Sequence, residues 1–226
     1  MYANQFSIGG YYSGLPGWEF SVEGYYKQMK HILEYQDGVS FFGTSTNWEE
    51  KVEMGEGRSF GLELMVQKTL GKTTGWLAYT LSKTDHRFKN GTINQGRWFP
   101  YKYDRRHSIS LCLNHKFSER IDVGASWIFN TGGCITVPER ETIIIRPEGN
   151  IESAPYISQR NNYRLPASHR LNLGINFNKK TKHGMRTWNI SLYNAYNAMN
   201  PNLVYSKWEQ NLIYNDFYNS IYPVSY

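Results

Sequence analysis

Hydrophobic and polar residues alternate with a period of two along most of the chain, and helical periodicity is nearly absent. A clear case runs through Ile109, Leu111 and Leu113, which are separated by small or polar residues. Alternation of this kind predicts β-strands with one apolar face and one polar face. The pattern predicts about nine strands: one through Ile109, Leu111 and Leu113, and eight at about 4–13, 18–35, 57–70, 74–86, 120–131, 168–179, 186–204 and 215–226.

The predicted strands are long, and the connections between them alternate in length. Many strands alternate over roughly ten residues or more, whereas most strands of globular proteins have about 5–6 residues. A strand that crosses a bilayer at a tilt needs about 9–11 residues. Because every second connection is long, all long loops fall at one end of the strands, as in outer-membrane β-barrels. The short connections lie at 13–17, 71–75, 118–120 and 179–184, and the long ones at about 36–56, 87–103 and 132–166.

The alternation alone does not say which face points outward. In a soluble β-sandwich the apolar face is the core, whereas in an outer-membrane barrel it faces lipid and the polar face lines a lumen. Strand length, loop asymmetry and an aromatic content of 16% favour the barrel. We therefore predict an all-β fold: an antiparallel meander that forms part of a transmembrane outer-membrane β-barrel, with short periplasmic turns and long extracellular loops. Taken alone, this chain should form an open, curved sheet with 4–13 and 215–226 as its edges.

Composition narrows the function. The net charge of +6 is scattered and forms no basic block, so no nucleic-acid partner is predicted. No run of ~20 apolar residues is present, which excludes a helical membrane span, and the N-terminal stretch lacks the features of a signal peptide. Cys112 and Cys134 have neither a CxxC partner nor a His at metal-ligand spacing. The sequence therefore predicts no metal site and no cofactor.

Four phrases, taken in order, carry a resemblance to a known family: "GRSFGLELMVQKTLGKTTGWLAYTLSKT" (57–84), "WFPYKYDRRHSISL" (98–111), "YRLPASHRLNLGINF" (163–177) and "ISLYNAYNAMNP" (190–201). Together they resemble the C-terminal part of a TonB-dependent outer-membrane receptor, over about 18–226. That family's barrel has about 22 strands and is plugged by a separate N-terminal domain. The resemblance implies that 1–226 is one partial barrel domain without a plug, a fragment of a longer protein.

The resemblance also implies a function. Such a receptor binds a scarce nutrient outside a Gram-negative cell and admits it across the outer membrane when energised TonB moves the plug. It is not an enzyme and uses no cofactor. The expected partners are outer-membrane lipid and lipopolysaccharide, a small nutrient ligand, a surface lipoprotein, and TonB only through the N-terminal part that this chain lacks. The alternatives are a passive porin-like or adhesin-like barrel and a soluble, secreted β-sandwich binding module.

Candidate site residues follow from the barrel interpretation. The segment from Tyr101 to His107 would lie at the extracellular rim, with His107 and His169 on the lipid side. Asp104, Arg106 and Arg170 would point into the lumen mouth. Paired Arg side chains could hold an anionic ligand; the alternative is a rim ion pair that also touches lipopolysaccharide phosphates. For the aromatic residues, the alternative to ligand stacking is ordinary loop packing. The full set of ligand-binding candidates is Trp98, Tyr101, Asp104, Arg106, Tyr156, Tyr163, Arg170 and Trp208.

Three further features have weaker functional interpretations. Glu23 and Glu63 are predicted on the lumen wall, paired with Lys or Arg on neighbouring strands rather than forming a metal or substrate pathway. Asp85, His86 and Arg87 lie where a strand enters a loop, and no nucleophile motif is nearby, so catalysis is not predicted. The segment 141–150 is predicted to form a small hairpin that turns at Pro147–Gly149, or a lid.

Overall fold

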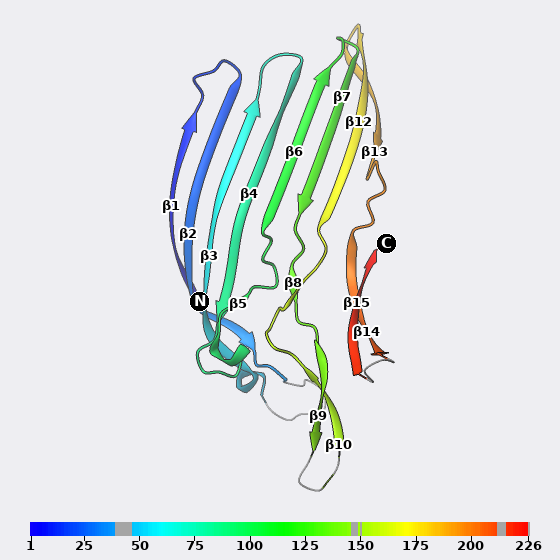
Figure 1. Ribbon diagram of the computed structural model, residues 1–226. Helices are drawn as coiled ribbons and strands as arrows, with labels where there is room; N and C mark the ends of the chain where they lie inside the picture. The colour runs from blue at the N-terminus through cyan, green and yellow to red at the C-terminus, as the bar shows by residue number, and fades with distance from the viewer. Residues whose placement is uncertain (39–46, 146–148, 150, 212–215, 226) are drawn as a thin grey trace.

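The computed structural model describes residues 1–38, 47–145, 149, 151–211 and 216–225. Its centre is a nine-stranded, all-antiparallel sheet in the order β1-β2-β3-β4-β6-β7-β12-β13, with β5 paired beside β4 (Figure 1). These strands are β1 (Tyr2–Tyr12), β2 (Trp18–Tyr35), β3 (Val52–Lys68), β4 (Thr73–Arg87), β5 (Phe99–Pro100), β6 (His107–Lys116), β7 (Ile121–Asn130), β12 (Ser168–Thr181) and β13 (Gly184–Leu192).

Six further strands form three small antiparallel pairs outside the main sheet. They are β8 (Cys134–Ile135) with β11 (Tyr163–Arg164), β9 (Arg140–Ile145) with β10 (Ile151–Tyr156), and β14 (Pro201–Asn211) with β15 (Asp216–Ser225). Two short 3₁₀ helices, η1 (Trp48–Lys51) and η2 (Asn94–Gly96), lie in the loops. Among the described residues, no helix is long and apolar enough to cross a membrane.

The predicted asymmetry of the connections is confirmed. Short turns join β1–β2, β3–β4, β6–β7 and β12–β13 at the upper end of the sheet in Figure 1, and the long connections lie at the lower end. Local chemistry accounts for the turns. Gly71 adopts a φ of 97° between β3 and β4, a conformation that costs glycine little. The hydroxyl of Ser118 accepts hydrogen bonds from the amides of Arg120 and Ile121, which tightens the β6–β7 turn.

The register confirms the predicted faces. Leu64 pairs with Tyr79, Tyr79 with Ile109, and so on across the sheet, so that apolar residues form ladders on one face. We call this the apolar face; ten residues predicted to share a surface all lie on it, namely Leu62, Leu64, Leu111, Leu113, Val123, Trp127, Leu171, Leu173, Ile190 and Leu192. His107 and His169 lie on the same face, and Arg170 lies on the other, as predicted.

Charged rows bound the apolar face. On β2 its apolar ladder runs from Tyr26 to Trp18, eight residue steps or about 26 Å at the usual rise per residue. The next rows toward the loops contain the pairs Arg58–Asp85 and Glu56–Arg87. Many side chains between these limits are exposed: Trp188 is 67% exposed, Ile190 65% and Leu192 57%. Within the described residues, no second layer covers this face.

Hydrogen bonds between small polar side chains cross the opposite face, which we call the polar face. Asn176 and Asn178 on β12 each donate to the Asp122 carboxylate on β7, both at 2.7 Å. Asn189 on β13 donates to Asn176 Oδ1 at 2.7 Å. These bonds satisfy side-chain polar groups between strands, so this face is suited to contact with water.

The buried core of the described residues lies at the loop end rather than along the sheet. It contains Phe88, Ile93 and Phe99 from the β4–β6 connection, packed against Ile32 of β2. Phe88 and Ile93 are fully buried. Phe88 packs over Gly55, where an added Cβ would lie 2.4 Å from the Phe88 ring. The long loops therefore fold back onto the ends of β2, β3 and β4.

Two sequence expectations need correction. The single strand predicted over 186–204 is wrong: β13 ends at Leu192 and β14 begins at Pro201. Between them Asn194 has a φ of 52°, and its side chain bonds the amide and carbonyl of Ala198. The Asn200 side chain bonds the backbone of His169 on β12 through its amide and carbonyl, which anchors the break.

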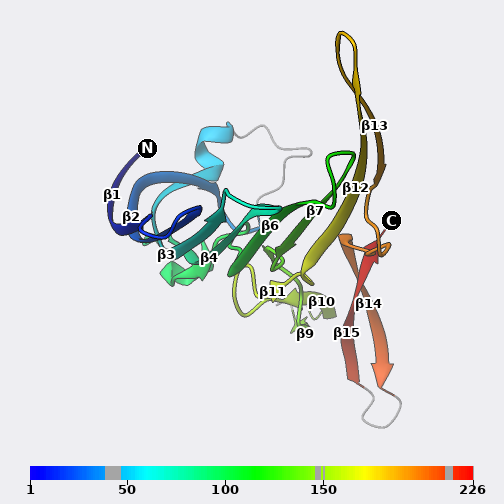
Figure 2. The ribbon, with the colours of Figure 1, turned by 90° about the horizontal axis from the view of Figure 1, so that it is seen from above.

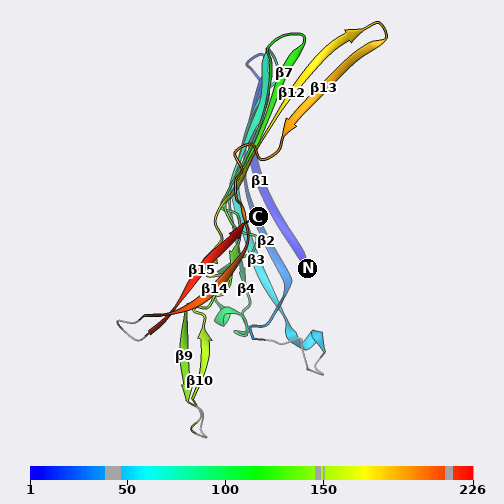
Figure 3. The same ribbon diagram turned by 90° about the vertical axis from the view of Figure 1, so that its right-hand side faces the viewer.

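As a result, the predicted sheet edges are only half right. The main sheet is open and curved, as Figure 2 shows from above, and β1 is one edge. The other edge is β13, because β15 pairs with β14 in a separate hairpin that leaves the sheet (Figure 3). The hairpin predicted at 141–150 is present as β9 and β10, whose register pairs Ile145 with Ile151; the tip at Pro147 lies outside the described residues.

Candidate functional site at the loop end of the sheet

Asp104 is a buried anchor of the long loops. Only 2% of the residue is exposed. Its Oδ1 accepts the Thr84 amide at 2.7 Å, and its Oδ2 accepts Arg164 Nη2 at 2.5 Å and Arg106 Nη2 at 3.2 Å. Arg164 also donates to the carbonyls of Asp104 and Gly132, at 2.6 and 2.8 Å. The carboxylate thus ties β11 and the β5–β6 connection to β4, and it does not lie open in a lumen mouth as predicted.

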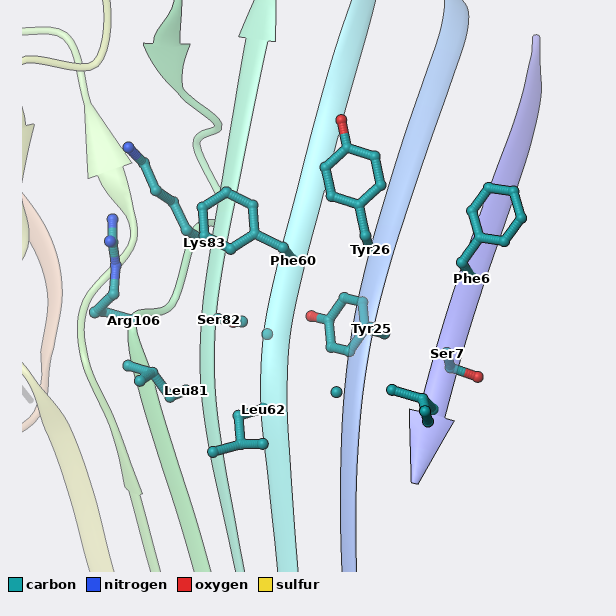
Figure 4. A pocket seen from close by; sticks show the side chains of 13 residues that line it. Phe6, Ser7, Tyr25, Tyr26, Phe60, Leu62, Leu81, Ser82, Lys83 and Arg106 are labelled. Carbon is teal, nitrogen blue, oxygen red and sulfur yellow. The ribbon is translucent and has the colours of Figure 1, made fainter. Parts of the chain in front are cut away.

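Arg106 also differs from its predicted place. It lines a groove together with Leu81 and Lys83, whose side chains belong to the apolar face (Figure 4). Its Nη2 pairs with Asp104, while its Nε is buried without a hydrogen-bond partner in the described part of the chain. The alternation that predicted a polar-face position does not hold here, because Arg106 precedes the first residue of β6.

Trp98 lies close to two guanidinium groups. Arg58 is 4.3 Å and Arg87 4.6 Å from its ring centroid. Arg58 pairs with Asp85 at 3.0 Å, and Arg87 pairs with Glu56. These two cation–π contacts pack the Trp98 ring against guanidinium groups at the loop ends of β3 and β4.

Tyr101 stacks on His86, with ring centroids 4.3 Å apart, and Phe99 meets the same imidazole edge-on at 6.4 Å. Burial lowers the pKa of His86 from 6.5 to about 4, although the neighbouring Asp85 opposes the shift. His86 lies beyond the apolar ladder, at the loop end of β4. It is therefore neutral at physiological pH and acts as a packing surface for Tyr101.

The other predicted ligand-binding residues lie on separate elements. Tyr156 packs against Arg140 within the β9–β10 hairpin, 4.3 Å from guanidinium to centroid. Tyr163 pairs with Ile135 in the β8–β11 ladder. Arg170 hydrogen-bonds the Tyr193 hydroxyl and lies 4.4 Å from its ring. Trp208 belongs to β14, and its side chain lies outside the described residues. The seven candidates whose side chains the structure describes therefore do not form one site.

Glu23 and Glu63 are register partners of each other on the polar face. Both are exposed, and no ion pair joins either carboxylate to a cation in the described part of the chain, so the expected pairing with Lys or Arg is wrong. They line a groove of about 390 Å³ with Ser21 and Thr80. Across the described residues, no three His, Cys, Asp or Glu side chains group closely enough to hold a metal ion.

The sequence pattern did not predict the role of Arg160, which joins three loops. Its Nη1 donates to the Tyr35 carbonyl at 2.9 Å and to Asp37 at 2.8 Å, and its own amide donates to Asn94 Oδ1 at 2.8 Å. Beside it lies a pocket of about 540 Å³ with a lining rich in amides and hydroxyls, including Gln36, Thr92, Asn94, Gln95, Ser158 and Gln159. The polar run from 158 to 162 is the one sequence signal that could have suggested it.

Comparison with the sequence profiles of known protein families gives no match, and comparison with curated proteins gives none either.

Proposed function

We propose that this chain forms part of the β-barrel wall of a TonB-dependent outer-membrane receptor, which binds a scarce nutrient and takes it up actively into a Gram-negative cell. The apolar face carries this proposal. It extends over eight long strands and is exposed. On β2 it is about 26 Å long, from Trp18 to Tyr26, and rows of charged residues follow Tyr26 on the side of the loops. An outer-membrane barrel presents an apolar band about 25 Å tall to lipid.

The opposite face supports the same assignment. Asn, Ser and Thr side chains bond one another between strands, and Glu23 and Glu63 face each other without a cation partner among the described residues. Unpaired carboxylates keep their hydration only where water reaches them. A face of this kind is suited to a wet lumen, whereas a soluble β-sandwich would need a second layer on the apolar side.

The loops fit a receptor as well. Arg160, Asp104 and the Phe88 cluster hold the long connections in a folded group at one end, and the amide-rich pocket beside Arg160 lies among them. On the proposed topology this end is extracellular, where a small polar nutrient first meets the receptor. TonB would act through an N-terminal part, and a surface lipoprotein could cover the loops.

Alternating accessibility tests the wall assignment. Single cysteines are placed at 109–113 of the whole receptor, in a background with Cys112 and Cys134 replaced by Ser. After reconstitution in vesicles, they are labelled by a water-soluble maleimide and by a lipid-soluble one. Positions 110 and 112 should react with the first and positions 109, 111 and 113 with the second. Equal reaction of all five with the water-soluble reagent, or recovery of the chain without detergent, would favour the β-sandwich alternative.

Active uptake is tested in cells that carry the whole receptor gene. A panel of labelled ferric chelates, cobalamin, oligosaccharides and peptides is offered before and after the proton gradient is collapsed. The receptor proposal expects saturable uptake of one class that stops with the gradient. Uptake that continues unchanged would favour a passive porin.

A further inference from the structure

The polar pocket of about 540 Å³ beside Arg160 is built by three segments that lie far apart in the sequence. They are the stretch that follows β2, the loop that contains η2, and the stretch that follows β10. All three lie at the lower, loop end of the sheet in Figure 1. The volume falls within the range of about 300–1,000 Å³ typical of small-molecule sites.

The charges around this pocket balance. Of the described residues that line it, only Asp37 and Arg160 are charged, and they pair with each other at 2.8 Å. Arg160 also pairs with Glu34 at 3.4 Å, and the guanidinium group of Arg97 donates to the Gln95 side chain at 2.9 Å. Two guanidinium groups therefore accompany two carboxylates. Because an anionic ligand is held by cations in excess, this arrangement favours an uncharged occupant.

Side-chain amides supply most of the hydrogen-bonding capacity that the pocket has to spare. Both polar atoms of the Gln159 side chain, the Oε1 of Gln36 and the Nε2 of Gln95 have no partner among the described residues. An amide presents an acceptor and a donor side by side. Two adjacent hydroxyl groups of a sugar match this pair, since each hydroxyl both donates and accepts. Ile157, 42% exposed, adds an apolar surface for the C–H groups of a sugar ring.

The backbone of the η2 loop is strained where Gln95 lines the pocket. Three consecutive residues adopt a left-handed conformation, with φ values of 47° at Asn94, 54° at Gln95 and 73° at Gly96. Glycine and asparagine adopt it readily, whereas glutamine does not. The buried Asn94 side chain holds this turn, because it accepts the Arg160 amide at 2.8 Å and donates to the Arg97 carbonyl at 3.2 Å. Strain that the surrounding structure maintains in this way is concentrated at functional sites.

We infer that this pocket binds an uncharged oligosaccharide, with the amides of Gln95 and Gln159 as its main contacts. The inference rests on the proposed function for its place in uptake, since that function puts the loop end outside the cell. The occupant must be uncharged and rich in groups that both donate and accept hydrogen bonds. Neutral sugars meet both conditions. Acidic ferric chelates fail the first, and peptides fail the second, because a main-chain amide only donates and a carbonyl only accepts.

The test measures binding to the whole receptor in detergent by isothermal titration calorimetry. The probes are neutral tetrasaccharides of glucose, mannose, galactose and xylose, with tetragalacturonic acid as the acidic counterpart and N-acetyl-tetraalanine amide as the peptide counterpart. We expect at least one neutral tetrasaccharide to bind at least tenfold more tightly than both counterparts. Binding of none of the neutral sugars, or equal binding of either counterpart, would overturn the inference.

Two substitutions locate the ligand in this pocket. Gln95→Gly removes the amide and relieves the backbone, so it should weaken saccharide binding at least tenfold without lowering the midpoint of thermal unfolding. Gln159→Leu keeps a side chain of similar size without polar atoms, and it should weaken binding by a similar factor.

Each substitution has a matched control. Asn197→Gly is the control for the first, because Asn197 also has a left-handed backbone, with a φ of 51°, in the exposed connection after β13. Gln67→Leu is the control for the second, because Gln67 lies near the turn end of β3, away from the pocket. Both controls should bind saccharide as the wild type does.

The failure of this inference is distinguishable from that of the proposed function. Wild-type binding by both Gln95→Gly and Gln159→Leu, or equal losses in the two controls, would overturn the saccharide site and leave the wall assignment intact. Saccharide binding that depends on Gln95, in a protein whose position 111 is open to water, would overturn the proposed function and leave the saccharide site in place.

Discussion

At the scale of single residues, the charged groups of the loop end act mainly on one another. Asp104 is held by two guanidinium groups and one amide, and Asp85 by Arg58 and Lys83. A buried carboxylate in such a network stabilises the fold only while its partners remain. The Asp-Arg-Arg-His run at 104–107 is therefore a structural joint between loops, and the Nε of Arg106 within it is buried without a hydrogen-bond partner in the described structure.

Asp104→Ala should destabilise the loop end by about 2–3 kcal/mol. Removal of one partner from a buried pair typically costs about 3–5 kcal/mol, and we place this case lower because Arg106 and Arg164 are each about one-third exposed. Urea unfolding and trypsin cleavage after the exposed Arg105 measure the effect. Glu63→Gln, on the open polar face, serves as the control and should change neither by more than about 0.5 kcal/mol.

His86 should make the fold less stable in acid. Its folded pKa of about 4 lies below the ordinary 6.5, so the unfolded chain binds the proton first as the pH falls. The contribution of neutral His86 to the free energy of unfolding is fully present above pH 6.5 and is lost as the pH falls toward 4. At 1.36 kcal/mol per pKa unit, the loss amounts to at most about 3 kcal/mol. Thermal unfolding between pH 4 and 8 measures it. His86→Phe, which keeps a ring without a titrating group, should flatten the curve in this window; an unchanged slope would contradict the assignment.

At the scale of elements, each strand carries two different environments on its two sides. On β6 the residues Ile109, Leu111 and Leu113 belong to the apolar face, while Ser108 bonds Asn130 across the polar face. This alternation is why a one-residue change of register would move every apolar side chain to the wrong side. The pairing of β6 with β4 and β7 is therefore determined by faces as well as by turns.

Leu111→Arg should cost about 2–4 kcal/mol in the membrane, the range for a cation placed on the lipid face near the bilayer centre. The change is measured in the whole receptor, as the free energy of folding into lipid vesicles. Ser110→Arg, one residue away on the polar face, is the matched control and should cost less than 1 kcal/mol. Equal costs at the two positions would contradict the assignment of the faces.

At the scale of the whole molecule, the main sheet is open. Its edges are β1 and β13, and every residue of both strands is exposed. Open edges leave rows of unpaired backbone N–H and C=O groups, and each such group costs several kcal/mol in hydrocarbon. The sheet of this chain therefore requires further strands beside β1 and β13 before it can lie in a bilayer.

The 226-residue chain extracted alone in mild detergent should consequently associate through its edges. Light scattering should give a broad distribution of oligomers, and gel mobility should not change on heating as it does for closed barrels. A monodisperse, heat-modifiable monomer would contradict this expectation and would favour a small closed barrel built from this chain.

Much of this architecture could be predicted from the sequence, because alternation and turn chemistry are local. Apolar and polar residues alternate with a period of two, and each segment carries this pattern in its own residues. The pattern predicts the strands between 18 and 131 and the faces on which Leu111 and Leu171 lie. The hairpin at 141–150 was likewise predicted from three consecutive Ile residues followed by turn-forming residues. The local pattern failed between 193 and 200, where the chain breaks into two strands.

What only the tertiary structure decided is which distant side chains meet. Asn200 anchors the break between β13 and β14 by bonding the backbone of His169, 31 residues away, and Arg164 reaches Asp104 across 60 residues. Glu23 and Glu63 face each other because the β2–β3 register places them so, although each alone suggests a partner of opposite charge. Register and loop packing depend on the energy of the whole sheet, so no local period encodes them. The sequence by itself determined the strands and their two faces; the fold decided that the predicted ligand residues would be divided among loops, and that a polar pocket would form beside Arg160.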